Sequence, residues 1–321
     1  MIALSSKGID ELLIRGTFVS GEDVARKLGV SRTAIFKRIR VLRSAGYSIK
    51  SVQGKGYRLL PRFDGLLPLE IRIKSRSTIF GRKIITLESV DSTQNYARKI
   101  ADAGAPEGAV IVALEQRAGK GRMSRAWLSP KGGLWFTLLL RPSAPMGELY
   151  KLTLLFGVSV ARALESYGLK PCLKWPNDVL VNGKKICGIL LETSGEPDRV
   201  DYVLVGIGLN VNFSSRDLPE DIRSSSTSVY DVLNRRVDRA DLLCQILKNS
   251  ESLYLSAAKE GFKKVIDAWR SMPCTIGRTV TVQSFGGSIS GRAVDIDDDG
   301  SLILETKDGR KKVYSGDVFF S

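Results

Sequence analysis

Residues 119–127, Gly-Lys-Gly-Arg-Met-Ser-Arg-Ala-Trp, form a basic run between two apolar, β-rich stretches, 109–114 and 134–140. This succession predicts a strand, an irregular loop and a second strand. The glycines allow a close approach of the backbone to a ligand, the cations surround them, and Trp127 offers a flat face for a base. The run therefore predicts a nucleotide-phosphate site. The alternative for the same residues is a solvated basic hairpin.

The run differs from the two common phosphate-binding motifs. A dinucleotide fingerprint requires a helix directly after its glycines, and a Walker A loop requires Gly-Lys-Ser/Thr at the start of a helix. Here an apolar, strand-like stretch follows the glycines. Neither of those motifs is predicted.

A β-hairpin is predicted further along the chain. Residues 174–178, Lys-Trp-Pro-Asn-Asp, lead into two apolar stretches that are separated by Asn182 and Gly183. Asn-Gly between apolar runs is typical of a two-residue hairpin turn. The hairpin places Asp178 at the start of one strand and sends Lys185 back along its partner.

Two further stretches of the sequence, 91–95 and 206–210, carry polar residues or glycines next to predicted helices and strands. Residues 91–95, Asp-Ser-Thr-Gln-Asn, have helix-start chemistry, and residues 206–210 form a strand-like run with two glycines and a final asparagine. The first of these blocks has a simpler alternative, a helix cap. Together the four blocks, with Lys185 and Gly188, resemble those of biotin–protein ligases, and the resemblance covers roughly residues 80–321.

The N-terminal segment has a different character. Residues 1–62 contain 13 lysines and arginines and 4 acidic residues, so they hold +9 of the chain's net charge of +15. Such asymmetry indicates a polyanionic partner. Three helical patterns and a glycine-tipped basic hairpin at 47–59 are typical of a winged helix-turn-helix. On the third helix Ile35, Ile39 and Leu42 share the inward face. The alternative is a small helical domain with a solvated basic face.

DNA contacts are predicted on the opposite face of that third helix and at the hairpin tip, because donors near the start of a recognition helix face base edges. The predicted DNA-binding residues are Ser31, Arg32, Thr33, Phe36, Lys37, Arg40 and Lys55. With this segment, the whole chain resembles the bifunctional form of the family, in which the ligase is also the biotin operon repressor.

Composition narrows the chemistry. The chain contains no histidine, which excludes Ser-His-Asp and Cys-His nucleophiles. Its four cysteines form no C-x-x-C pair, so we expect reduced thiols and no protein-built metal site. No apolar run approaches the ~20 residues of a membrane span, and no leader is recognised, so a cytoplasmic location is expected.

The remaining chain completes an α+β fold. Helices are predicted over 152–167, 240–255 and 261–270, and a buried strand over 201–212. The polar stretch 213–228 is either a disordered connection or a ligand lid. Short alternating strands follow Pro273. We expect an N-terminal winged helix-turn-helix (1–62), a central mixed-sheet α/β ligase domain (63–272) and a C-terminal SH3-like β-barrel (273–321).

The resemblance implies an ATP-dependent ligase. The biotin carboxylate attacks the α-phosphorus of ATP, giving biotinyl-5'-AMP, and a lysine of a carboxylase biotin carrier domain then takes the biotin. It also implies Mg²⁺ held largely by phosphate oxygens, a homodimer, and binding to operator DNA. Two alternatives remain: a non-catalytic biotin-sensing repressor, and a lipoate–protein ligase.

The resemblance and the chemistry of the side chains together assign three sets of residues. The biotin-binding set is Ser92, Thr93, Gln94, Gln116, Lys120, Gly121, Arg122 and Lys185. The ATP- and adenylate-binding set is Lys120, Arg122, Arg125, Trp127, Asn177 and Asn210. The catalytic set is Arg122, Lys185 and Asp178, where Asp178 orients the incoming lysine.

Two positions depart from the family's loop. Lys120 stands where arginine is usual, which keeps the charge but loses the bidentate fork. Ser124 stands where glycine is usual, and its Cβ is costly if the backbone there has a positive φ. Both departures bear on how tightly the loop retains its adenylate.

Overall fold

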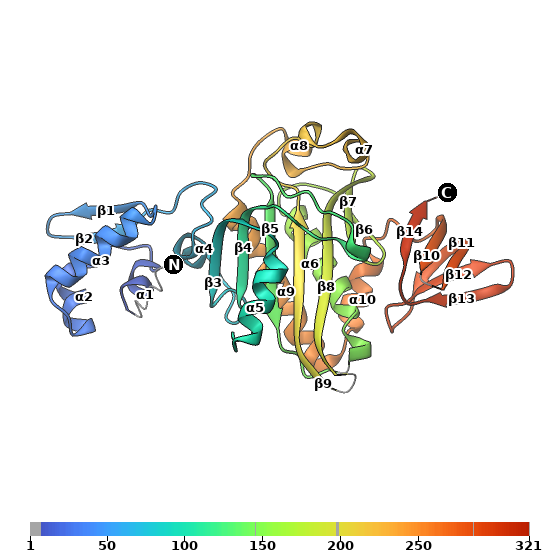
Figure 1. Ribbon diagram of the computed structural model, residues 1–321, viewed down its shortest axis with the longest axis horizontal. Coiled ribbons are helices and arrows are strands. Elements are labelled where there is room, and N and C mark those ends of the chain that lie inside the picture. Colours follow the sequence, from blue (N-terminus) through green and yellow to red (C-terminus); the bar gives the residue numbers. More distant parts are fainter. Residues whose placement is uncertain (1–7, 145, 197–198, 285, 321) are drawn as a thin grey trace. The chain divides into compact units, whose positions relative to one another are not determined.

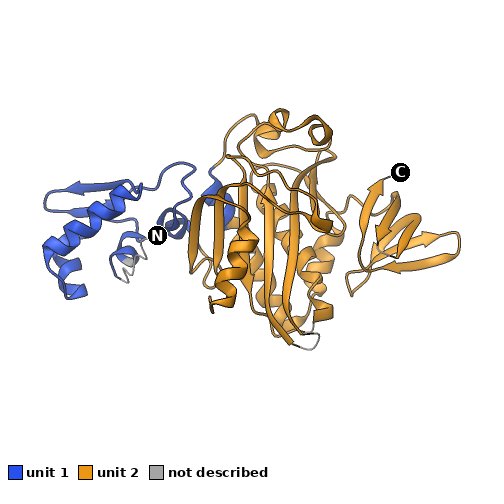
Figure 2. Ribbon diagram, viewed as in Figure 1, with its two compact units in different colours: residues 1–75, 238–244 blue, residues 76–237, 245–321 orange. Residues whose placement is uncertain are grey.

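The computed structural model describes residues 8–144, 146–196, 199–284 and 286–320. The chain divides into two compact units (Figure 2). One consists of Met1–Ser75 with Asp238–Cys244, and the other of Arg76–Val237 with Gln245–Ser321.

The first unit contains the expected winged helix-turn-helix. Its elements are α1 (Ile9–Leu13), α2 (Gly21–Leu28), α3 (Arg32–Ser44), the antiparallel hairpin of β1 (Ile49–Val52) and β2 (Gly56–Leu59), and α4 (Pro68–Lys74). Ser20 accepts hydrogen bonds from the first turn of α2, and Gly29 ends that helix with φ 64°. Ile35, Ile39 and Leu42 are buried, so the face predicted for the core is confirmed.

Buried and partly buried ion pairs complete this unit. Glu70, which is fully buried, accepts hydrogen bonds from Nε of Arg62 (2.8 Å) and from the backbone N–H of Arg62 (3.2 Å). Arg239 lies 2.6 Å from Asp64, and Lys74 pairs with Asp238. These contacts explain why residues from the start of a later helix belong to the N-terminal unit.

A seven-stranded mixed sheet forms the centre of the second unit (Figure 1). Its order is β3-β4-β5-β9-β8-β7-β6, and only β3 and β4 run parallel. The strands are β3 (Ile84–Val90), β4 (Val110–Gln116), β5 (Leu134–Leu140), β6 (Pro171–Lys174), β7 (Asp178–Val181), β8 (Lys184–Glu196) and β9 (Arg199–Leu209). Asn182 and Gly183, both with positive φ, form the predicted two-residue turn between β7 and β8.

Helices cover the sheet unequally. α5 (Thr93–Asp102) packs on β4, β5 and β9 on one face, and α6 (Lys151–Glu165), α10 (Lys263–Arg270) and the later turns of α9 (Arg239–Glu260) lie on the other (Figure 1). α6 is almost entirely buried, as its apolar stripe predicts. The face that carries α5 therefore has the smaller helical cover.

The C-terminal segment is a small antiparallel β domain, which confirms the expected fold class. Its order is β13-β12-β11-β10-β14, with β10 (Thr279–Ser284), β11 (Gly287–Ile296), β12 (Leu302–Thr306), β13 (Gly309–Val313) and β14 (Asp317–Phe320). Trp175 anchors it, because its Nε1 donates to the carbonyl of Gly300 (3.1 Å) and its backbone N–H donates to Thr275 Oγ1 (3.0 Å).

The other compositional expectations concern cysteines, metals and membranes. All four cysteines are free, and burial raises the pKa of the Cys187 thiol. Over the described residues no cluster of three or more His, Cys, Asp or Glu side chains is arranged to hold a metal ion. Within the same ranges, every helix is too short or too polar to span a bilayer.

Candidate functional site

A cavity of about 260 Å³ opens on the α5 face of the central sheet. The residues predicted to bind biotin or ATP or to act in catalysis all line it, although they come from the four separate blocks of sequence and from Gln116, at the end of β4. They are Ser92, Thr93, Gln94, Gln116, Lys120, Gly121, Arg122, Arg125, Trp127, Asn177, Asp178, Lys185 and Asn210. Their charged members are four cations and one carboxylate, and a second carboxylate, Asp317, also lines the cavity. This balance suits an anionic ligand.

The start of α5 forms the polar end of the cavity. Ser92, Thr93 and Gln94 are buried, and Ser92 Oγ accepts a hydrogen bond from the backbone N–H of Gln94 (3.2 Å). Ser92 is thus the N-cap of the helix as well as a cavity residue, so the helix cap is confirmed and the predicted binding role is compatible with it. Gln94 Nε2 donates to the carbonyl of Leu190 (3.0 Å), which ties the helix start to β8.

Glycines on β8 and β9 form the floor beneath Trp127. Gly188 and Gly208 are cross-strand partners. A Cβ on Gly208 would lie 2.4 Å from Trp127 Nε1, and a Cβ on Gly188 would lie 2.9 Å from the same indole. The indole therefore packs directly on the backbone of both strands. Its buried Nε1 has no hydrogen-bond partner among the described residues.

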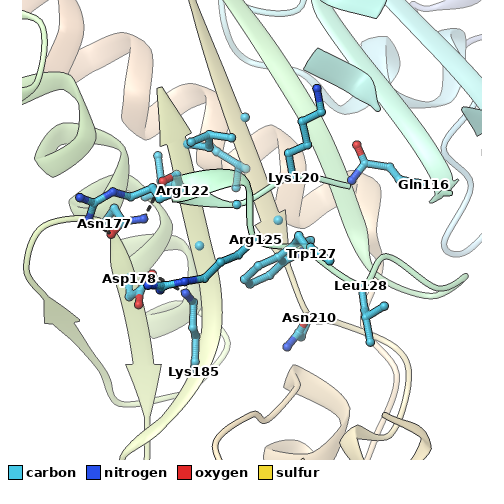
Figure 3. A pocket seen from close by; sticks show the side chains of 18 of the residues that line it. Gln116, Lys120, Arg122, Arg125, Trp127, Leu128, Asn177, Asp178, Lys185 and Asn210 are labelled. Carbon is cyan, nitrogen blue, oxygen red and sulfur yellow. Dashed lines mark hydrogen bonds and ion pairs between the residues drawn. The ribbon is translucent and has the colours of Figure 1, made fainter. Parts of the chain in front are cut away.

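Lys185 lies between Asp178 and the indole (Figure 3). Its Nζ is 2.7 Å from Asp178 Oδ1 and 5.2 Å from the centre of the Trp127 ring, a cation–π contact. The predicted hairpin thus brings two of the three catalytic candidates together. Lys174, the cross-strand neighbour of Asp178, lies over the ring of Phe320 (5.0 Å), and burial lowers the pKa of Lys174.

The basic loop is held by the C-terminal β domain. Arg122 Nη1 donates to Asn177 Oδ1 (3.2 Å) and to the carbonyl of Gly316 (3.1 Å), and it lies 3.5 Å from Asp317. Arg125 also forms an ion pair with Asp317. Sequence reasoning missed Asp317, because nothing around it in the last strand signals a ligand site.

The two departures of the loop have different consequences. Met123 and Ser124 adopt φ values of 52° and 59°, the left-handed region that favours glycine. The serine therefore occupies a backbone position at which its Cβ is costly. Lys120 is exposed, and its Nζ reaches Asn95 Oδ1 (3.3 Å).

The polar stretch 213–228 is an ordered segment that contains η3 (Ser215–Asp217) and α7 (Glu220–Arg223). Its disordered alternative is wrong. The backbone of Lys185 donates to the carbonyl of Ser225 (2.8 Å) and accepts from Thr227 (2.9 Å), so the segment pairs with β8 beside the cavity. Four of its residues, missed from sequence, line the cavity: Leu218, Ile222, Ser225 and Ser226.

The side-chain amides of Asn177 and Asn210 both donate hydrogen bonds to backbone carbonyls of the protein. Asn210 Nδ2 donates to the carbonyl of Thr227 (2.9 Å), and Asn177 Nδ2 donates to the carbonyl of Ile189 (2.9 Å). Asn210 thus fastens the segment 213–228 to the end of β9. Asn177 positions Arg122.

The winged helix presents the predicted DNA-binding side chains to solvent. Ser31 Oγ caps α3 by accepting from the N–H of Ala34 (3.1 Å). The remaining predicted residues are exposed on α3 or at the hairpin tip: Arg32, Thr33, Phe36, Lys37, Arg40 and Lys55. Arg43, next to them, instead donates to the carbonyl of Ile49 (2.7 Å) and fixes the hairpin against the helix.

Three family models match the chain: an HTH domain over residues 9–58, the biotin/lipoate A/B protein ligase family over 86–210, and the biotin protein ligase C terminal domain over 275–321. The bifunctional ligase/repressor BirA of Bacillus subtilis is 41% identical over 94% of this chain and 93% of its own length. BirA of Escherichia coli is 30% identical over 95% and 93%. Among solved structures, the biotin protein ligase of Aquifex aeolicus in complex with biotin and ATP is 34% identical, with a TM-score of 0.66 over 75% of this chain and 99% of that one.

Proposed function

The chain belongs to the biotin protein ligase family in its bifunctional ligase/repressor form, and we propose that it attaches biotin to a carrier-domain lysine through an adenylate. The observation that carries the proposal is the convergence of all thirteen predicted ligase residues on one cavity. An oxygen of the biotin carboxylate attacks the α-phosphorus of ATP, and the bond to pyrophosphate breaks. The lysine nitrogen of the carrier then attacks the acyl carbon, loses a proton, and releases AMP.

Charge stabilisation is the main contribution of the protein to the first step. Two anions must approach each other, and three cations that line the cavity, Lys120, Arg122 and Lys185, supply the opposing charge (Figure 3). Cations already held in place, as Arg122 and Lys185 are, stabilise developing charge without reorganising during the reaction. We assign Arg122 to the α-phosphate, because Asn177 already holds its guanidinium in place (3.2 Å).

Asp178 and Trp127 have supporting roles. Asp178 is paired with Lys185 (2.7 Å), and it orients the amine of the acceptor lysine once the ligand carboxylate engages Lys185. Trp127 packs against adenine from its position on the glycine floor.

Mg²⁺ enters, in this proposal, with the nucleotide. The carboxylates of the cavity, Asp178 and Asp317, are both paired with cations. These residues suit an Mg²⁺ ion that would be held mainly by triphosphate oxygens, with few protein ligands. Such an ion would supply positive charge to the pyrophosphate, and Asp178 and Asp317 are the cavity carboxylates that would help to hold it.

Biotin-dependent exchange of labelled pyrophosphate into ATP tests the first step without an acceptor protein. We expect exchange with biotin and none with lipoate, since the polar end of the cavity offers partners for a ureido ring. Exchange with lipoate alone would favour the lipoate ligase. Biotin binding without any exchange would leave a biotin-sensing repressor.

We also propose that the chain represses biotin genes as a homodimer on a two-fold operator. Exposed cations of α3 and of the hairpin tip support DNA binding, because phosphate contacts supply most of the affinity. A free strand edge supports dimer formation. β7 pairs with β8 only as far as Gly188, and in the described ranges no strand covers that edge from Leu190 to Glu196.

Selection of duplexes from a random-sequence library, with and without biotin and Mg·ATP, tests the repressor. We expect the adenylate-loaded protein to select a palindrome, and Lys37→Ala with Arg40→Ala to lose that selection. Identical selection without biotin and ATP would contradict the coupling between ligand and DNA binding.

A further inference from the structure

A chain of hydrogen bonds runs behind the polar end of the cavity. Thr137 Oγ1 donates to Thr93 Oγ1 (2.9 Å), and Thr93 donates to Gln116 Oε1 through its hydroxyl (3.0 Å) and its backbone N–H (2.8 Å). Gln116 Nε2 donates to Ser129 Oγ (2.8 Å), and Ser129 donates to the carbonyl of Trp127 (3.1 Å). Thr137, Thr93 and Ser129 are all buried.

The direction of each of these hydrogen bonds is fixed, because the series includes one group that can only donate and one that can only accept. The backbone N–H of Thr93 only donates, so Gln116 turns its oxygen toward Thr93 and its nitrogen toward Ser129. The carbonyl of Trp127 only accepts, so it takes the single proton of Ser129. Ser129 can therefore only accept from Gln116.

The backbone leaves room for this arrangement at one position. A Cβ on Gly119 would lie 2.7 Å from Ser129 Oγ and 3.1 Å from Gln116 Nε2. The first glycine of the basic loop thus has a second reason to lack a side chain, besides the approach of a ligand. Any larger residue would push Ser129 and Gln116 apart.

We propose that Ser129 and Thr137 are positioning residues that hold the Gln116 amide with its nitrogen available to the cavity, so that this end of the pocket selects a ring carbonyl. The proposal rests on the proposed biotin-binding function of the cavity. Both lone pairs of Gln116 Oε1 are used by Thr93, and one amide hydrogen is used by Ser129. The hydrogen-bonding capacity that remains is the second amide hydrogen, a donor that matches the carbonyl oxygen of a cyclic urea.

The Ser129 hydroxyl connects the Gln116 amide to the basic loop. Ser129 pairs with Gln116 on one side and with the carbonyl of Trp127 on the other, and the backbone N–H of Gln116 donates to the carbonyl of Ser129 (3.1 Å). Without the hydroxyl, the Gln116 nitrogen loses its partner, and only Thr93 still holds the amide, at its oxygen.

Comparison of biotin with 2-iminobiotin tests the proposal. The analogue carries a protonated guanidine in place of the urea, so it donates where biotin accepts. Calorimetric titration of the full chain without ATP gives both dissociation constants. In Ser129→Ala we expect the Kd for biotin to rise roughly tenfold, the effect of one hydrogen bond, while the Kd for iminobiotin is unchanged or falls. The preference for biotin therefore shrinks.

Further variants separate positioning from general damage. Thr137→Val removes the hydroxyl that donates to Thr93, at nearly constant side-chain volume, and should also reduce the preference for biotin over iminobiotin. Thr137→Ser keeps a hydroxyl and should keep that preference. Ser89→Ala is the control. It deletes a hydroxyl that accepts from Arg117 (3.4 Å) and takes no part in the hydrogen bonds around Gln116, so it should change neither the Kd for biotin nor the Kd for iminobiotin.

Each outcome is decisive. An unchanged ratio of the two constants in folded Ser129→Ala, or equal weakening of both ligands, would overturn the proposal. If Ser129→Ala does not fold, Thr137→Val decides in the same way. Failure of the wild-type chain to bind biotin would instead refute the proposed function.

Discussion

The carboxylate of Asp317, at the start of the last strand, lies 3.5 Å from the guanidinium of Arg122 in the basic loop. Asp317 also pairs with Arg125, so one carboxylate of the C-terminal β domain holds two of the loop's cations. A phosphate, like this carboxylate, is an anion with oxygen acceptors, and guanidinium groups bind either one. The C-terminal domain therefore holds the loop in place, and in the proposed function a nucleotide phosphate takes the place of Asp317.

Asp317→Asn should loosen the loop. Arg122 keeps Asn177 and the carbonyl of Gly316, but Arg125 loses its carboxylate. We expect faster trypsin cleavage at the cations of the loop in the free protein, and a fall in kcat/KM for ATP of about tenfold, the scale of one charged hydrogen bond. Limited proteolysis and steady-state kinetics measure the two effects. Asp308→Asn, at an exposed pair with Lys311 on the same domain, is the matched control. A loop as resistant as the wild type would contradict the holding role.

Lys185→Met should remove a cation from the reaction centre. We expect kcat/KM for biotin to fall by about 10²–10³, as for loss of one stabilising donor, while Lys184→Met, at the exposed neighbour, leaves it unchanged. The variant also leaves Asp178, mostly buried, without its cation (2.7 Å in the wild type). Lys185→Met with Asp178→Asn should therefore recover thermal stability without recovering activity. Recovery of both stability and activity would show that Lys185 and Asp178 have a structural role and no catalytic one.

Ser124→Gly should stabilise the loop. The serine has φ 59°, where a Cβ is unfavourable and glycine is not. We expect a gain of about 0.5–1 kcal/mol in the free energy of unfolding, and slower release of biotinyl-AMP. Ser124→Ala, which keeps the Cβ, should give neither. Urea denaturation and adenylate dissociation rates check both statements, and faster release from Ser124→Gly would show that the left-handed conformation is not the adenylate-bound one.

The carboxylate of Glu251 should make stability depend on pH. Burial alone would raise its pKa, but the backbone N–H groups of Thr78, Phe80 and Ile79 donate to it and lower the pKa below the ordinary 4.5. A lowered folded-state pKa gives a contribution that is complete above pH 4.5 and is lost as the pH falls through the folded value. Glu251→Gln should cost about 1–3 kcal/mol at pH 7 and progressively less below pH 4.5. A cost independent of pH would contradict the assignment.

Local chemistry accounts for what could be predicted from sequence. Asn182 and Gly183 specify a tight turn by their own backbone preferences, so the approach of Lys185 to Asp178 followed from the turn. The capping hydroxyls and apolar spacing of the winged helix act within a few residues in the same way.

Tertiary packing determined what could not be predicted. Asp317 reaches the basic loop because the C-terminal domain packs against the central domain, with Trp175 among the contacts. The order of the segment 213–228 depends on backbone pairing with Lys185, and its polar sequence carries no sign of that partner. The position of Arg43 on its helix resembles that of a DNA contact, yet its guanidinium donates to the carbonyl of Ile49 in the hairpin.

Biotin transfer itself can be measured by mass spectrometry of an acceptor carrier domain that is incubated with the protein, biotin and Mg·ATP. We expect a mass shift of one biotinyl group on the acceptor lysine, and a rate reduced by at least about a hundredfold in Arg122→Ala. Biotin that binds to the chain but never reaches the acceptor would contradict the ligase and leave a sensor-repressor.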